Sequence, residues 1–273
     1  MSMTRPTKET LDRRAIHILI GCGLAILAAL VAAWYLERER NNFDAETLCR
    51  KDQPLSGHFV ILVDKSDRMT PHEVESLKAR IRALKTAERF VRNAMVSIFI
   101  VNSDSLDMLT PSFRLCNPGT RQDVNPLIAN PDFVQRYFDR KFFQPLDDAL
   151  EKLAVPETSP TSPILESIKQ VSELAEFKNV DGVRTLIIFS DMVQNTADYS
   201  QYGGSLALES LKRTSYFAKN KAALNGVSIE VYYLTRAQGP QSTKHREFWR
   251  EYFALVGAQT PILMTVPKRV GSR

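Results

Sequence analysis

The sequence predicts an α/β protein in which a doubly wound, mostly parallel, Rossmann-like sheet follows one transmembrane helix. Short apolar runs alternate with segments of helical periodicity, a pattern typical of parallel strands connected by helices. Ahead of them, residues 15–36 form an apolar run free of Asp, Glu, Lys and Arg, about as long as a bilayer-spanning helix needs. The 273 residues suffice for this anchor and one globular domain, so no second domain is required.

The run at residues 15–36 is the predicted membrane anchor. Trp34 and Tyr35 suit a membrane interface, and the charged sequence ERER that follows ends the span. A cleaved signal peptide and a buried core helix are the alternatives, but the run is long for a signal peptide. The predicted organisation is an N-terminal arm at 1–14, the transmembrane helix at 15–36, a juxtamembrane linker at 37–56 and the α/β domain at 57–273.

Charge does not orient this anchor, because basic residues flank it on both sides. Cysteine usage is more informative. Cys22 lies within the apolar run, which leaves Cys49 and Cys116 in the rest of the chain and hints at a disulfide between them. We therefore expect a single-pass protein of a bacterial inner membrane with a periplasmic C-terminal domain. Two unrelated reduced cysteines in a cytosolic domain are the alternative.

The net charge of +5 is spread over segments of mixed sign and forms no long basic block. It therefore gives no reason to expect a nucleic-acid partner.

Apolar runs bounded by turn residues predict the strands, and helical periodicity predicts the helices between them. The first helix has the clearest start, with Thr70 as N-cap, Pro71 at the first helical position and Glu73 placed for a capping box. The predicted strands cover 58–64, 96–101, 185–190, 227–234 and, at an edge, 261–266; the predicted helices cover 70–92, 131–153, 164–177, 206–224 and 244–256.

Two further segments allow a prediction about their structure. Residues 102–130 lack periodicity and predict a long irregular loop, of the kind that often has a function. Within the helix predicted after it, the stripe formed by Phe133, Tyr137, Phe142 and Leu146 has helical spacing and predicts packing against the core.

The carboxyl ends of two predicted strands carry aspartates, Asp64 and Asp191. Ligands of open parallel sheets bind at this edge, so the two carboxylates are expected to converge there. Ser66 adds an oxygen donor two positions after Asp64, and oxygen donors so arranged favour a hard divalent cation. The alternative is that each aspartate caps a helix or binds loop amides, a common task at strand-to-helix turns.

The order of these motifs resembles that of a von Willebrand factor type A (vWA) domain over residues 57–266. Asp64 and Ser66 match the Asp-x-Ser-x-Ser loop of that family's metal-ion-dependent adhesion site, Ser162 stands where the family has a threonine, and Asp191 matches the aspartate after a central strand. The resemblance implies that these residues hold Mg²⁺ or Mn²⁺, with Thr161 as the alternative to Ser162. It also implies that an acidic side chain of a protein partner completes the coordination of the cation.

Arg68 departs from the family pattern, which has a serine at that position. A guanidinium pointing inward would replace the cation and pair with Asp64 or Asp191. One pointing outward would leave a weakened metal site.

The sequence therefore predicts a membrane-anchored, vWA-like module that binds another protein and has no catalytic activity. A metal-dependent, phosphatase-like hydrolase using Asp64 and Asp191 is the competing class. Haloacid dehalogenase-like phosphatases also place an aspartate after the first strand, but their second aspartate, two residues on, is Ser66 here. A structural domain whose metal site has decayed is the third possibility.

Overall fold

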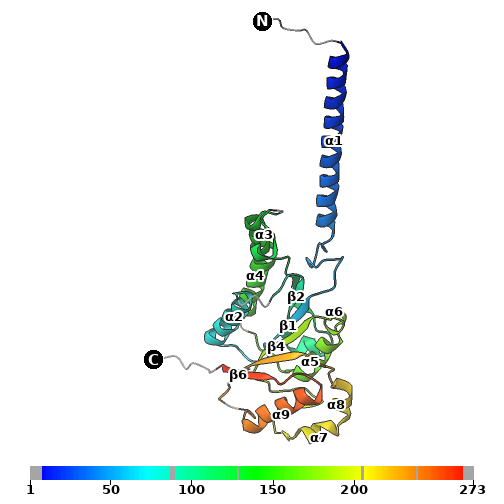
Figure 1. Ribbon diagram of the computed structural model, residues 1–273. Coiled ribbons are helices and arrows are strands. Elements are labelled where there is room, and N and C mark those ends of the chain that lie inside the picture. Colours follow the sequence, from blue (N-terminus) through cyan, green and yellow to red (C-terminus); the bar gives the residue numbers. More distant parts are fainter. Residues whose placement is uncertain are drawn as a thin grey trace. The chain divides into compact units, whose positions relative to one another are not determined.

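The computed structural model describes residues 8–86, 90–127, 129–155, 157–203, 206–237 and 239–266 (Figure 1). The chain divides into two compact units, Met1–Asp44 and Ala45–Arg273. The described part of the first unit is dominated by helix α1 (Lys8–Asn41). Its stretch Ala15–Tyr35 has a mean hydropathy of 2.5 and is 0% buried. By length and composition it can cross a membrane, a property that signal sequences share.

The second unit is built on a six-stranded sheet with the order β3-β2-β1-β4-β5-β6. Strand β3 runs antiparallel to β2, and the other neighbouring strands are parallel. Every residue of the central strand β1 is buried, as expected where helices cover both faces. The predicted fold class, a mostly parallel α/β sheet, is confirmed. The strands are β1 Gly57–Asp64, β2 Ala94–Val101, β3 Pro111–Cys116, β4 Val183–Ser190, β5 Ser228–Leu234 and β6 Ile262–Val266.

Helices cover the two faces of this sheet, with α2 and α4 on one side and α5 and α9 on the other (Figure 1). Each face has its own hydrophobic core, to which alternate residues of the buried strands contribute. The helical segments are α2 Pro71–Thr86, η1 Ser103–Leu106, η2 Arg121–Asp123, α3 Pro131–Phe138, η3 Asp139–Phe143, α4 Gln144–Leu153, α5 Ile164–Glu173, α6 Ala175–Lys178, α7 Leu208–Lys212, α8 Ser215–Asn220 and α9 Thr243–Leu255.

The predicted capping box opens α2. The Thr70 amide donates to the Glu73 carboxylate at 2.7 Å, and the Glu73 amide donates to the Thr70 hydroxyl at 3.3 Å. The predicted extent of this helix is wrong, because the described helix ends at Thr86 and residues 90–92 are not helical. Residues 87–89 of the predicted helix lie outside the described residues.

Two other predicted segments differ from the structure. The irregular segment 102–130 contains β3, which pairs with β2 as the edge strand of the sheet and so satisfies backbone groups that a loop would leave to water. The helix predicted at 206–224 is two short helices, because Thr214 ends one and caps the next by accepting from the Phe217 amide at 3.1 Å.

The aromatic stripe of the third predicted helix divides between core and surface. Phe142 and Leu146 are buried, as predicted, within the core that also holds α2. Phe133 is 63% exposed and Tyr137 is 38% exposed, so the prediction that these two residues pack against the core is wrong. The physical reason is that α3 packs through Phe138, on its opposite side.

A disulfide joins Cys49 to Cys116, the pair that the cysteine count singled out. Around it the chain adds backbone contacts: the Cys116 amide donates to the Thr47 carbonyl at 2.7 Å, and the Arg50 amide donates to the Asn93 side chain at 2.9 Å. The segment from Ala45 onward thus belongs to the compact domain, which begins earlier than residue 57.

We expect this disulfide to contribute about 2–4 kcal/mol to the free energy of unfolding, because it closes a long loop in the unfolded chain. Reduction should lower the urea midpoint of the wild-type protein by the corresponding amount. The double variant Cys49→Ala/Cys116→Ala should be insensitive to reductant, whereas Cys22→Ala, the matched control, should keep the response. Equal urea midpoints with and without reductant in the wild type would contradict the prediction.

Candidate functional site

The two aspartates of the predicted site lie side by side at the carboxyl ends of neighbouring strands. Asp64 is the last residue of β1, Asp191 directly follows β4, and these strands pair in parallel. Their side chains are nearly enclosed, since Asp64 is 5% exposed and Asp191 is 4% exposed. Parallel pairing in register therefore produces the convergence that the sequence predicted.

Asp64 uses both carboxylate oxygens. Oδ1 accepts from the Ser66 amide at 2.9 Å, which fixes the turn after β1. Oδ2 accepts from the Ser162 hydroxyl at 3.2 Å and from the Ser190 hydroxyl at 2.6 Å. One carboxylate thereby connects β1, β4 and the loop ahead of α5. Sequence analysis missed Ser190 as a partner, although its place beside Asp191 at the end of a buried strand was visible.

Asp191 uses one oxygen in the same way. Its Oδ1 accepts from the Val193 amide at 2.9 Å, and Met192 between them has a φ of 64°, a strained conformation for a residue other than glycine. The indole of Trp249 supports this turn by donating to the Met192 carbonyl at 2.8 Å. The loop-amide role considered for both aspartates is thus real, but it engages only one oxygen of each.

The second oxygen of Asp191 faces an arginine that the sequence analysis missed. Arg236 lies two residues beyond β5, with Nε 4.0 Å from Asp191 Oδ2 and 3.3 Å from Asp67 Oδ2. Its guanidinium also pairs with Glu73, which is completely buried. A basic residue just beyond a third parallel strand was the available signal, since that strand ends at the same edge.

Arg68 does not fill the role that was considered for it. It is exposed, and no described residue forms an ion pair with it. The inward orientation considered for the Arg68 guanidinium is therefore wrong. The positive charge beside the aspartates comes from Arg236 instead.

Ser162 and Thr161, the two alternatives for one hydroxyl ligand, have different hydrogen-bond partners. Ser162 is 4% exposed and donates to Asp64, whereas the Thr161 hydroxyl donates to Ser103 at 3.0 Å. The structure thus brings Ser162, and not Thr161, to the aspartates. Ser66 is half-buried, and its amide is bound to Asp64.

A small cavity of about 50 Å³ lies between these groups, with room for an ion or for small polar groups. Tyr202, 53% exposed, stands at its rim. Tyr199 does not, because its ring is stacked on Tyr216 with centroids 5.4 Å apart. The residues that line the cavity are Ser66, Asp67, Ser159, Thr161, Ser162, Asp191, Val193, Asn195 and Tyr202.

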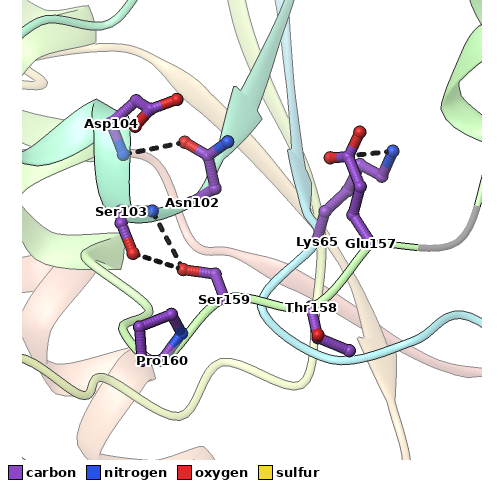
Figure 2. A pocket seen from close by; sticks show the side chains of 8 residues that line it. All are labelled: Lys65, Asn102, Ser103, Asp104, Glu157, Thr158, Ser159 and Pro160. Carbon is purple, nitrogen blue, oxygen red and sulfur yellow. Dashed lines mark hydrogen bonds and ion pairs between the residues drawn. The ribbon is translucent and has the colours of Figure 1, made fainter.

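A wider polar cavity of about 250 Å³ adjoins it, beyond Ser159 (Figure 2). Its most enclosed charged group is Lys65, 3% exposed, whose Nζ lies 3.1 Å from the half-exposed carboxylate of Glu157. On the other side, the hydroxyls of Ser103 and Ser159 lie 2.7 Å apart and hydrogen-bond (Figure 2). This edge of the sheet therefore presents two neighbouring polar depressions.

Burial of Asp191 is the main cause of the electrostatic properties of the smaller cavity. Burial, followed by the negative charge of Asp64, raises the pKa of Asp191 to about 8, while the Val193 amide and Arg236 oppose the shift. The site thus tends to hold a proton at neutral pH when no external cation is present. The candidate ligands Asp64, Ser66, Ser162 and Asp191 offer two carboxylates and two hydroxyls, the oxygen chemistry that Mg²⁺ and Mn²⁺ prefer.

Solved structures similar to this chain include the VWA domain of SpRpn10 (11% identity, covering 80% of this chain and 91% of that chain, TM-score 0.40). BatB from Bacteroides thetaiotaomicron shares 14% identity, covering 78% of this chain and 91% of that chain, with a TM-score of 0.40. An aerotolerance-related membrane protein from Bacteroides fragilis shares 11%, covering 77% and 90%, with a TM-score of 0.33. No protein-family model matches the sequence, and no curated protein matches it.

The likeness to these structures concerns the fold alone. In this chain the sheet carries one antiparallel edge strand on a parallel core, and the three segments that the sequence singled out meet at the carboxyl ends of β1 and β4.

The raised pKa of Asp191 predicts a pH-dependent stability. In chelator, the folded state should hold a proton that the unfolded state loses above its pKa of 3.8, so the stabilisation is full below that pH and is lost as pH rises towards about 8. Its slope should not exceed about 1.4 kcal/mol per pH unit. Urea unfolding across this range should show the decline in the wild type and in Asp181→Asn, an exposed control, but not in Asp191→Asn. An unchanged slope in Asp191→Asn would contradict the assignment.

Proposed function

We propose that this protein is a membrane-anchored, vWA-like module that binds another protein through the carboxyl edge of its sheet. The observation that carries the proposal is the convergence of Asp64, Ser162 and Asp191 beside a cavity that opens next to Tyr202. Buried carboxylates placed side by side repel each other and destabilise a fold. Their presence at a surface cavity favours a binding role over a structural one.

A divalent cation is part of this proposal. Asp64, Ser66, Ser162 and Asp191 would hold Mg²⁺ or Mn²⁺. The Ser162 hydroxyl, which donates its proton to Asp64, keeps lone pairs for a metal. When bound, the cation would supply an electrophilic position for an acidic side chain of the partner. Arg236 does not replace it in this view, since its charge is shared with Glu73 and Asp67.

Asp64 is unsuited to act as a nucleophile, and we propose no catalytic role for it. Both of its oxygens accept hydrogen bonds, and one accepts two. These hydrogen bonds stabilise the carboxylate and lower its nucleophilicity towards a phosphate. Hydrolysis of a phosphate ester that Asp64→Asn abolishes would overturn this part of the proposal.

The proposed location is a bacterial inner membrane with the domain on the periplasmic side. The apolar stretch of α1 is the anchor in this proposal, and the disulfide between Cys49 and Cys116 favours an oxidising compartment. Fractionation of cells, with protease added to intact spheroplasts, tests both points. Protection of the domain from that protease would contradict the periplasmic location.

We expect calorimetric titration of Mg²⁺ or Mn²⁺ to detect binding at sub-millimolar concentration. The variant Asp64→Ala should abolish it, because this carboxylate positions the Ser162 hydroxyl as well as the metal. Asp104→Asn removes the same charge from an exposed aspartate near the neighbouring cavity and should leave binding unchanged. Equal binding by the wild type and Asp64→Ala would exclude the metal at this site.

A photo-crosslinking amino acid at Tyr202 should capture the partner in cells, and the product should disappear when Asp64→Ala is added. The matched control replaces Val183, which is 58% exposed at the opposite, amino end of β4. It should give no product of the same mass. Crosslinking that is equal at both positions, or that persists without Asp64, would contradict binding at the carboxyl edge.

A further inference from the structure

The exposed aromatic residues of α3 belong to a wider surface that the proposed function does not use. Phe133 and Tyr137 are exposed, and so are Arg136, Arg140 and Lys141. Their spacing of three and four residues places them along one side of α3 and η3. We call these five residues the aromatic-basic face.

The opposite side of the same segment explains why this face is directed outward. Phe138 and Phe142 are buried, and their rings stack with centroids 5.3 Å apart. Leu146 continues this buried row into α4. With one side fixed in the core, the aromatic-basic face is held on the surface as part of a well-packed helix.

Within the part of the chain that the structure describes, the cations of this face form no ion pairs. No carboxylate within the described residues forms an ion pair with Arg136, Arg140 or Lys141. The nearest acidic groups in sequence are engaged elsewhere, since Asp132 pairs with Arg121 and Asp139 accepts from the Gln135 amide nitrogen at 3.1 Å. The face thus combines unpaired positive charge with exposed aromatic rings.

We propose that the aromatic-basic face binds the headgroup region of an anionic lipid bilayer. Aromatic rings are favoured at the boundary between headgroups and acyl chains, and each cation near an anionic surface contributes about 1 kcal/mol. The proposal rests on the anchor proposed above, which would keep the domain at a bilayer and make a weak contact effective. A protein partner would need carboxylates placed to match the three cations, whereas an anionic bilayer presents mobile phosphate groups that can match them in any arrangement.

The test uses the full-length protein in lipid nanodiscs of phosphatidylcholine alone or mixed with phosphatidylglycerol. Amide hydrogen exchange of residues 131–141 should be several-fold slower in the anionic discs. The triple variant Arg136→Gln/Arg140→Gln/Lys141→Gln should exchange in anionic discs as the wild type does in neutral ones. Phe133→Ser/Tyr137→Ser should also lose protection.

A matched control separates this face from net charge. Lys219→Gln/Lys221→Gln/Lys244→Gln removes the same charge from exposed lysines on other elements and should keep the protection. Equal exchange in neutral and anionic discs, or an equal loss in the control variant, overturns the proposal and leaves the face to a protein partner. Failure of the chain to enter the discs would instead refute the anchor, and crosslinking at Tyr202 reports on the carboxyl edge independently of both.

Discussion

The acceptance of two hydroxyl protons by Asp64 is the interaction on which the site depends. A single oxygen, Oδ2, joins Ser190 at the end of β4 and Ser162 in the loop ahead of α5 to the end of β1. These three segments are far apart in sequence and meet only because β1 and β4 pair in parallel. The backbone reinforces the link, since the Ser162 amide donates to Asn195 at 2.8 Å and the Asn195 amide donates back at 3.0 Å. Removing the carboxylate would therefore release the loops as well as the charge.

Electrostatic balance at this edge is divided between two cations with different partners. Arg236 compensates the completely buried Glu73 at the start of α2, and its approach to Asp191 is more distant. Lys65 turns to the other side, towards Glu157. Neither cation lies closer than 4.0 Å to the Asp191 carboxylate, which explains how burial and Asp64 can raise the pKa of Asp191 despite the positive charge nearby.

Features that depend on a local sequence pattern could be predicted. Buried strands appear in the sequence as apolar runs, and the capping box of Thr70 and Glu73 follows from residue type and spacing. Aspartates at the ends of neighbouring parallel strands must converge. Arg236 could not be assigned in this way. Its role depends on which strand lies beside β4 and on where its long side chain turns, and neither is encoded in a short motif. Arg68 departs from the family pattern, but whether its guanidinium reaches the aspartates depends on whether the side chain is buried or exposed. That property follows from the fold and not from a short motif.

The exposed aromatics of α3 illustrate the same limit in another form. Helical spacing defines a side of a helix but does not say whether that side meets the core, because Phe133 and Tyr137 are aromatic residues just as Phe138 and Phe142 are. The two rows compete for the core, and the one that stacks inside it determines the exposure of the other. Cys116 ends β3 opposite Met95, near the start of β2, and the following turn reaches α3 through Arg121 and Asp132. The aromatic-basic face is thus connected to the amino end of the sheet, whereas Asp64 and Asp191 lie at its carboxyl end. Contact at one end leaves the other accessible, so a lipid surface and a protein partner need not compete for this domain.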